Sequence, residues 1–558
     1  MRKSFLLRTT AGVLVFAAAL LLAATVPAAD KTAELDAYLS AACDVLRFQG
    51  AVLVADDGVP VFVKGYGMAD VAHGQPNTPE TEFLIGSVTK QFTAAAILQL
   101  QEQGTLSVHD PISKFLPDFP KATGDRITVH HLLTHTSGLV SYTDIDSLMA
   151  RRGLDMTARE IVASFKDLPL QFEPGAMYRY CNSGYFLLGL IIEAVSGQTY
   201  ADYLAEHIFR PLGMTHTTYP PNERTPNRAV GYVAPEDTLV PADPISMTLP
   251  YAAGALASTV GDLLIWDQAL YGDRVLSEDS RKQMYTPALE NYGYGWMVAE
   301  RFGRREISHG GGIDGFTSVI ARYPDDRLTI IVLCNNMSAN AAGLGSTLAA
   351  IMFDQPYDRP VRKTPAAADP ASFDALVGVY RVGDNSYRVI RRDGDNLYSQ
   401  RTGGPVFQVF PEAPDKFFFE NDNSTTLVFI RDQAGAVVAH LIHQSGVDTR
   451  CDRVTGPLAD SLMAERAVVP IDPAVFARLV GDYELAPGFV LTFRARDGRF
   501  FSQATGQQEF EIFPAGETEY FLRVVDAQIT FQLDPATGRA TGLILHQGGR
   551  DMPAKKIK

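Results

Sequence analysis

Apolar residues recur at strand spacing near both ends of the first 355 residues and at helical spacing between them. A helical pattern over 33–46 precedes the first strands, and an Ala-rich helical pattern runs from Ser87 to Gly104. The order strands, helices, strands predicts an α+β domain over residues 30–357 whose sheet is built from both ends of the segment. The β-rich runs are 51–54, 61–66, 306–308, 317–323 and 328–333, and a turn at Asp56-Asp57-Gly58 joins the first two.

A second pattern follows a linker at 358–370 that is rich in Pro and Ala. One unit occurs twice at an offset of 103 residues, so that FDALVGVY at 373–380 matches FARLVGDY at 476–483. Each copy alternates short β-rich runs with turns, which predicts small antiparallel, lipocalin-like β-barrels over 371–456 and 471–558. The barrels are either inert spacers or elements that gate the substrate, and both alternatives stay open.

The beginning of the chain has the pattern of an export signal. Arg2, Lys3 and Arg8 precede an almost wholly apolar run at 11–24, and small residues suited to cleavage follow. This pattern predicts a signal peptide over residues 1–28 and an exported mature chain, periplasmic or secreted from a bacterium, with no membrane span. An uncleaved membrane anchor is the alternative, because the apolar run is nearly long enough to span a bilayer.

Composition narrows the class of partner. The chain has 558 residues, enough for two to four domains, and its formal charge of −15 argues against a nucleic-acid partner. Its four cysteines could pair in three ways in an oxidising compartment, but scattered buried thiols are the favoured interpretation. They are Cys43, Cys181, Cys334 and Cys451.

The stretch FLIGSVTKQFTAAAILQL at 83–100 is the first candidate for chemistry. It places Ser87 at or just inside a helix N-terminus, and Lys90 lies one turn further on the same face. A serine hydroxyl needs a base to become a nucleophile, and a lysine can be that base if burial lowers its pKa. The alternative is that Ser87 caps the helix and Lys90 is a solvated surface residue.

Two further stretches contain candidate residues. Tyr180 and Asn182 lie where a turn meets an apolar helix at 185–192, so that Tyr180 could relay a proton as a phenolate beside Lys90, and Asn182 could bind a substrate amide. His309 is expected at the end of a strand, followed by the glycines of 310–312. These glycines would let a substrate backbone lie close, and Gly312 could donate its N–H to an oxyanion. The alternatives are that Tyr180 is simply packed, that Asn182 simply caps the helix, and that the glycines form a loop beside an incidental histidine.

Three histidines require separate consideration as metal ligands. His131 and His135 are four residues apart, a spacing that can ligate zinc on a helix, and His130 lies beside them. However, Thr136-Ser137-Gly138 breaks any helix at once. We therefore expect these histidines and Thr134 to hydrogen-bond a tight loop, and we predict no metal site.

Ser87-x-x-Lys90, Tyr180-x-Asn182 and His309-Gly310-Gly311, in that order, resemble the three-motif signature of the penicillin-recognising serine hydrolases. The resemblance covers about residues 35–355 and points to the branch that holds class C β-lactamases, D-Ala-D-Ala carboxypeptidases, D-aminopeptidases and related esterases. The two additional barrels resemble the layout of bacterial D-aminopeptidases. The surrounding stretches that agree are HLLTHTSGL at 131–139, YCNSGYFLLG at 180–189, PLGMTHT at 211–217, GALASTVGDL at 254–263 and HGGGIDGF at 309–316.

This resemblance implies a β-lactamase-like fold, with an antiparallel sheet flanked by helices and an all-helical subdomain, and an acyl-enzyme mechanism. Ser87 would attack a carbonyl while Lys90 and Tyr180 move the proton, and the N–H groups of Ser87 and Gly312 would form the oxyanion hole. Asn182 and the strand at 309–311 would bind the substrate. No metal or organic cofactor is implied, the partner is a small molecule or peptide, and the oligomeric state is left open.

The third motif departs from the β-lactamase pattern, which usually begins with lysine and reads K-T-G. Histidine occurs at this position in the family's D-aminopeptidases and in several of its esterases, so an amide or ester without an obligatory carboxylate is the expected substrate. We further expect His309 to act through a hydrogen bond or a switchable charge, because imidazole titrates near neutrality. The alternative function is a penicillin-binding or sensing protein that acylates with little turnover, or a weak β-lactamase.

Overall fold

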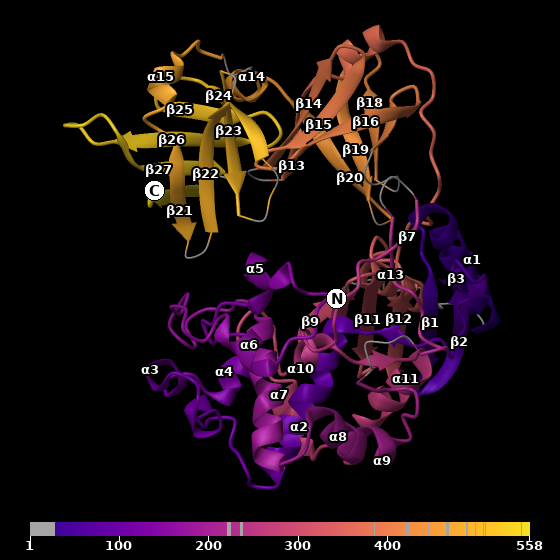
Figure 1. Cartoon of the computed structure of the whole chain (residues 1–558). Coiled ribbons are helices and arrows are strands. Elements are labelled where there is room, and N and C mark those ends of the chain that lie inside the picture. Colours follow the sequence, from indigo (N-terminus) through magenta and orange to yellow (C-terminus); the bar gives the residue numbers. More distant parts are fainter. Residues whose placement is uncertain are drawn as a thin grey trace, which may run out of the picture.

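The computed structural model shows one α+β domain followed by two barrels (Figure 1). The structure describes residues 28–219, 225–234, 238–383, 386–419, 425–444, 446–464, 468–486, 489–496, 498–505, 507, 509–547 and 550–558. The predicted signal peptide therefore falls outside the described residues, apart from Ala28. In the described part of the chain, no helix combines the length and apolar character needed to cross a membrane.

A six-stranded antiparallel sheet organises the first domain, and both ends of the segment build it as predicted. Strand β1 (Gly50–Asp56) lies between β2 (Val59–Tyr66) and β12 (Leu328–Cys334). The order continues through β11 (Phe316–Tyr323) and β10 (Arg304–Ile313) to β9 (Met297–Arg301) at the edge.

Helices cover both faces of this sheet, which explains why β12 is buried along its whole length. On one face, Val52 and Val54 pack with α1 (Ala28–Leu46) and α13 (Ala341–Met352). Their neighbours Ala51 and Leu53 point to the opposite face, where they join a larger core that also contains α11 (Val260–Ala269). Both tryptophans of the chain, Trp266 and Trp296, are fully buried in this larger core.

Helix α2 (Thr89–Glu102) runs through the larger core and packs on α7 (Asn182–Ser196) and α10 (Tyr251–Gly254). Its Ala94-Ala95-Ala96 run is completely buried, since small side chains let neighbouring helices approach closely. The remaining short helices here are α3 (Lys121–Gly124), α4 (Val129–Leu133), α5 (Asp146–Met149), α6 (Ala158–Ala163), α8 (Tyr200–Leu204), α9 (Arg210–Leu212) and α12 (Glu278–Met284). Short paired strands are β3 (Met68–Asp70) with β4 (Gln75–Pro76), β5 (Phe83–Leu84) with β8 (Ala257–Ser258), and β6 (Tyr232–Val233) with β7 (Val240–Pro241).

The two repeats fold into two closed eight-stranded antiparallel barrels, as the alternating pattern predicted. Closure leaves neither barrel with an unpaired edge strand. The first contains β13 (Gly378–Gly383), β14 (Ser386–Asp393), β15 (Asn396–Arg401), β16 (Val406–Ala413), β17 (Lys416–Phe419), β18 (Thr426–Arg431), β19 (Val437–Gln444) and β20 (Val447–Val454). The second contains β21 (Gly481–Ala486), β22 (Phe489–Arg496), β23 (Arg499–Ala504), β24 (Glu509–Pro514), β25 (Glu519–Leu522), β26 (Ala527–Leu533), β27 (Ala540–Gln547) and β28 (Arg550–Lys556). Helices α14 (Pro457–Met463) and α15 (Pro473–Phe476) lie between them in the sequence.

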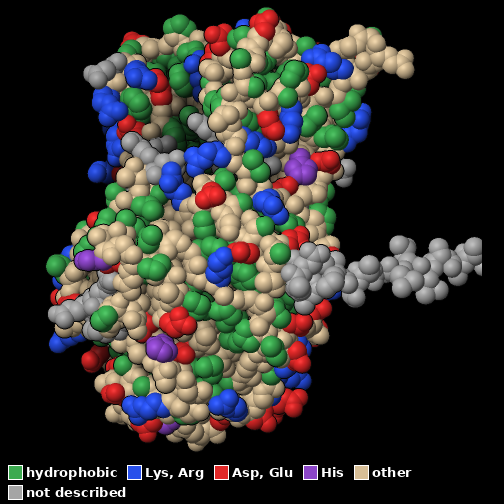
Figure 2. All heavy atoms as spheres, turned by 90° about the vertical axis from the view of Figure 1, so that its right-hand side faces the viewer, with side chains coloured by type: hydrophobic (Ala, Val, Ile, Leu, Met, Phe, Trp, Pro, Cys, Tyr) green, Lys and Arg blue, Asp and Glu red, His purple; other side chains and the backbone are tan. Residues whose placement is uncertain are grey.

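Polar contacts join the linker to the first barrel and the two barrels to each other. In the linker, Asp358 pairs with His443 of the first barrel at 2.6 Å, and the barrels meet where the Val406 N–H donates to the Val524 carbonyl at 3.4 Å. Figure 2 shows the barrels stacked on the α+β domain, with acidic and basic side chains interspersed over the visible face. All four cysteines are free thiols, in agreement with the favoured interpretation.

Candidate active site

Ser87 lies in a single 3₁₀ turn, Gly86–Val88, immediately before α2. The turn needs glycine at position 86, because its φ is +51° and a methyl group there would come within 2.8 Å of the Gly312 nitrogen. Two segments far apart in the sequence, the Ser87 turn and β10, are therefore in backbone contact. This contact places the amide of Gly312 beside the loop that carries Ser87.

Lys90 is completely buried, and its side-chain nitrogen has three polar neighbours. Nζ lies 3.0 Å from Ser87 Oγ, 2.8 Å from Asn182 Oδ1 and 2.7 Å from the carbonyl oxygen of Ala253. Burial lowers the pKa of Lys90 well below its ordinary value, and no carboxylate of the described chain pairs with it. A neutral amine donates two hydrogens, which suit Asn182 and Ala253, and its lone pair then faces the Ser87 hydroxyl.

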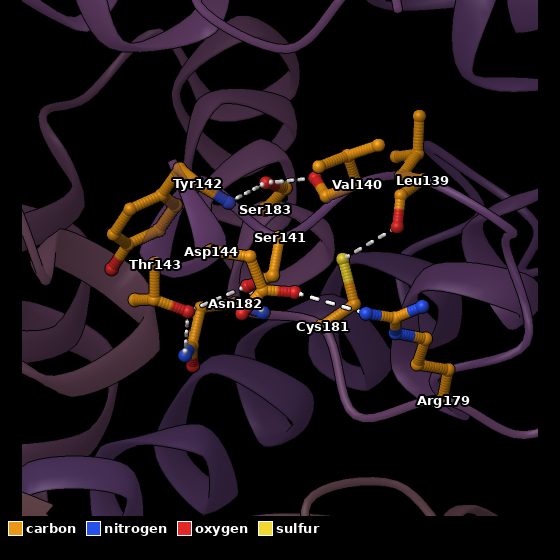
Figure 3. Close-up of polar contacts among 10 residues, drawn as sticks. All are labelled: Leu139, Val140, Ser141, Tyr142, Thr143, Asp144, Arg179, Cys181, Asn182 and Ser183. Carbon is orange, nitrogen blue, oxygen red and sulfur yellow. Dashed lines mark hydrogen bonds and ion pairs between the residues drawn. The ribbon is translucent and has the colours of Figure 1, made fainter. Parts of the chain in front are cut away.

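A loop at 139–144 holds Asn182 at the start of α7 (Figure 3). The Asn182 N–H donates to Ser141 Oγ at 3.1 Å, and its side-chain amide donates to Thr143 Oγ1 at 3.4 Å. The neighbouring Ser183 Oγ accepts from the Tyr142 N–H and donates to the Val140 carbonyl, both at 2.8 Å. Asn182 therefore reaches Lys90 from a backbone that is fixed on both sides.

Tyr180 is the most accessible of the three predicted catalytic residues, with 36% of its surface exposed. The Lys90 Nζ lies 4.9 Å from the centre of its ring. Burial of the hydroxyl raises the pKa of Tyr180, and an interaction with the Ser87 side chain only partly offsets this. The expectation of a phenolate beside an ammonium was wrong, because burial raises the pKa of the Tyr180 phenol and lowers the pKa of the Lys90 amine, and so disfavours both charges.

His309 lies within β10 and not at its end, which corrects the sequence prediction. The strand continues through the glycines, which pair with β11 as Gly310↔Val319, Gly311↔Ser318 and Gly312↔Thr317. Glycine is required at 311, where a methyl group would lie 2.0 Å from the Ile85 carbonyl oxygen. At Gly312, by contrast, nothing lies within 4 Å of the added methyl position, so there is room beside the strand.

Both ring nitrogens of His309 are engaged. Nδ1 donates to the Gly310 carbonyl at 2.6 Å, and Nε2 accepts from the Tyr292 hydroxyl at 2.9 Å. Burial, together with the charge that Lys90 would carry, lowers the pKa of His309 to about 4. The expectation of a switchable charge near neutrality was therefore wrong, and the imidazole is a neutral hydrogen-bonding group at pH 7.

The histidines near 130 have structural contacts, as predicted. Nδ1 of His131 accepts from the Thr128 N–H at 3.2 Å in a capping box, and Nδ1 of His135 accepts from the Cys181 N–H at 3.1 Å. Within the described ranges, no group of three or more His, Cys, Asp or Glu side chains is placed to hold a metal ion.

Sequence reasoning missed several residues that support the site. Tyr292 binds His309 and also packs at 4.6 Å, between ring centres, on His135, which itself lies 4.2 Å from the Tyr180 ring. The Ala253 carbonyl is a backbone group, so no residue type could have indicated it. Ser141 and Thr143 follow the HTSGL stretch directly, and that proximity was the available signal.

The geometry combines a hydroxyl with a buried neutral amine, a phenol and a nearby backbone amide, a set suited to nucleophilic attack on a carbonyl. Residues 37–350 match the Beta-lactamase family, and the chain belongs to this family of serine hydrolases. Residues 465–556 match a domain of unknown function, DUF3471.

Known proteins resemble more than the α+β domain alone. Penicillin-binding protein 4* of Bacillus subtilis (strain 168) is 32% identical over 405 residues, which is 67% of this chain and 88% of that protein. The octameric penicillin-binding protein homologue from Pyrococcus abyssi superposes with a TM-score of 0.56 at 26% identity, over 75% of this chain and 99% of that one. The D-amino acid amidase from Ochrobactrum anthropi SV3, complexed with L-phenylalanine amide, superposes with a TM-score of 0.51 at 26% identity. The match covers 58% of this chain and 97% of the amidase chain.

Proposed function

We propose that this protein is an exported serine hydrolase that cleaves the amide or ester bond of a D-residue peptide, a D-aminoacyl amide or a small ester. The observation that carries the proposal is the buried, uncompensated Lys90 amine 3.0 Å from Ser87 Oγ. A lysine with a lowered pKa can accept the serine proton near neutral pH, which a solvated lysine cannot.

In the proposed reaction, Ser87 Oγ attacks the substrate carbonyl as its proton passes to Lys90 Nζ. The N–H groups of Ser87 and Gly312 stabilise the oxyanion, and the proton taken up by Lys90 passes through the phenol of Tyr180 to the departing amine or alcohol, which leaves both side chains neutral. Water then attacks the acyl-enzyme carbonyl while Lys90 Nζ takes its proton, and the return of that proton to Ser87 Oγ as the ester bond breaks releases the acid and restores the serine. The open side of Gly312 supports a substrate backbone that lies along β10.

The proposed substrate class rests on the third motif and on the comparisons. A buried neutral histidine at 309 offers no cation for a substrate carboxylate, which favours uncharged amides and esters. The D-amino acid amidase of Ochrobactrum anthropi, which was complexed with an amino acid amide, supports this substrate class. A protein that is acylated by penicillin with little turnover is the second candidate, because relatives carry the name penicillin-binding protein.

A hydrolysis panel on the purified mature protein separates these candidates. The substrates are D- and L-phenylalanine amide, p-nitrophenyl acetate and a chromogenic cephalosporin, and the control is Ser87→Ala. We expect turnover of a D-amide or an ester, and loss of at least about a thousandfold in kcat for Ser87→Ala.

A stoichiometric burst with a labelled penicillin and no turnover of any amide or ester would favour the penicillin-binding alternative. Activity of Ser87→Ala at a tenth or more of wild type would contradict both candidates, since neither works without the nucleophile.

A further inference from the structure

The interior of the first barrel contains polar residues that the catalytic site does not use. Arg388 on β14, Ser399 on β15, His440 on β19 and Cys451 on β20 are all buried. The strand register puts His440 directly opposite Cys451, and Arg388 lies on the same side of β14 as the core residue Ile390. These four side chains therefore share the inside of the barrel with an otherwise apolar core.

The guanidinium of Arg388 is buried without a counter-ion. The residue is 8% exposed, its Nη1 donates to Ser399 Oγ at 2.8 Å, and its Nε has no hydrogen-bond partner. The Phe419 ring also faces the guanidinium, with its centre 5.5 Å from Cζ. No carboxylate of the described chain forms an ion pair with Arg388, and a buried cation without a partner is costly.

His440 has no measurable exposure, and neither of its ring nitrogens has a hydrogen-bond partner. Its ring lies 4.9 Å from Tyr380 and 5.8 Å from Phe429, measured between ring centres. Burial and the positive charge of Arg388 lower the pKa of His440 to about 3, so it is neutral and keeps one N–H to donate.

The second barrel shows that the fold does not need an arginine, a histidine or a cysteine at these positions, although it keeps a buried serine, Ser502, where the first has Ser399. At the 103-residue offset, Leu491 replaces Arg388, Leu543 replaces His440 and Ala554 replaces Cys451. The register supports this correspondence, because Leu543 pairs with Ala554 as His440 pairs with Cys451. All three replacements are buried in the second core.

We propose that the first barrel binds the carboxylate of a small apolar monocarboxylic acid inside its core. The Arg388 guanidinium forms the ion pair, the His440 N–H donates a hydrogen bond to the same anion, and the aromatic rings contact its hydrocarbon part. A monoanion matches the single guanidinium in the core, whereas the second charge of a phosphate dianion would lie unbalanced among Tyr380, Phe419 and Phe429.

The test is calorimetric titration of the full-length protein at constant ionic strength with acetate, benzoate and hexanoate. Hexanamide is the neutral match for hexanoate, and inorganic phosphate is the competing anion. The test variant is Arg388→Leu, which introduces the leucine found at the equivalent position of the second barrel. The control variant is Arg494→Leu, which removes the same charge from an exposed arginine of the second barrel.

We expect one of the carboxylates to bind wild type and Arg494→Leu equally, and Arg388→Leu at least about tenfold more weakly. His440→Leu introduces the leucine found at the equivalent position of the second barrel and should also weaken binding. It replaces Arg388→Leu as the test variant if Arg388→Leu does not fold. Three results would overturn the proposal: no carboxylate binds wild type, hexanamide or phosphate binds as tightly, or the two core variants bind like wild type.

Discussion

Replacing Lys90 with methionine tests the central claim about the catalytic base. Methionine has a similar length and no charge, so Lys90→Met removes the base while filling the same space. Loss of a general base costs about 10²- to 10⁴-fold in rate, which is about 3–5 kcal/mol of transition-state stabilisation. We therefore expect the acylation rate constant to fall by that factor, measured with a fluorophosphonate probe under pseudo-first-order conditions.

The stability of the same variant tests the lowered pKa of Lys90. In Lys90→Met, Asn182 Oδ1 and the Ala253 carbonyl each lose a hydrogen-bond donor, which lowers the unfolding free energy by about 1–3 kcal/mol each. Removal of the buried polar amine offsets part of that loss. Between the folded-state pKa of Lys90 and its unfolded value of about 10.4, the unfolded chain binds one more proton than the folded chain. The unfolding free energy of wild type should therefore rise with pH in this window, by at most about 1.4 kcal/mol per pH unit, relative to Lys90→Met.

Tryptophan fluorescence is a suitable probe, because both tryptophans of the chain lie in the α+β domain and report its unfolding without the barrels. Urea unfolding at pH 7, 8 and 9 gives the difference between wild type and Lys90→Met. A difference that stays constant with pH, or a variant that keeps a tenth of the acylation rate, would refute a neutral lysine base.

Three further predictions use the same assays. Gly311→Ala should lower the unfolding free energy by about 1–3 kcal/mol, because its methyl group would collide with the Ile85 carbonyl; a fluorescence-detected midpoint equal to that of wild type would contradict the close approach. Asp267→Asn should cost about 3–5 kcal/mol in the same experiment, because it leaves the Arg322 guanidinium, 2.9 Å away, as a buried charge without its partner. His309→Gln should leave the shape of the kcat/KM profile unchanged between pH 5 and 8, since the wild-type pKa of His309 is about 4; loss of a titration step in that range would disprove a neutral imidazole.

Sequence reasoning predicted the elements of this protein well where one physical signal dominated. The first two strands are β-rich runs joined by a turn at Asp57-Gly58, and they pair as a hairpin. The barrels repeat a pattern of short strands whose edges closure protects. The three-residue spacing puts Ser87, in the 3₁₀ turn that leads into α2, on the same side as Lys90 in the first turn of α2, so their approach to 3.0 Å follows from helical geometry.

The errors concern properties that depend on the surrounding structure. A run of three glycines normally indicates a loop, yet Gly311 pairs with Ser318 within β10. Position 311 is glycine because the Ile85 carbonyl leaves no room for a side chain. The protonation states of Tyr180 and His309 depend on how deeply their polar atoms are buried, which no local pattern encodes. The Ala253 carbonyl reaches Lys90 across 163 residues of sequence, and only the fold brings them together.

The pairing of β1 with β12 has a consequence for biosynthesis. Gly50 lies opposite Cys334, so 284 residues separate partners in the same ladder. At about 5–20 residues per second, roughly 15–60 s pass between the synthesis of the two strands. During that interval the β1–β2 hairpin has an open, apolar edge, whereas each barrel closes with strands made close together in time. The α+β domain is therefore the part of the nascent chain that most needs protection from aggregation, because its sheet is complete only after β12 has been made.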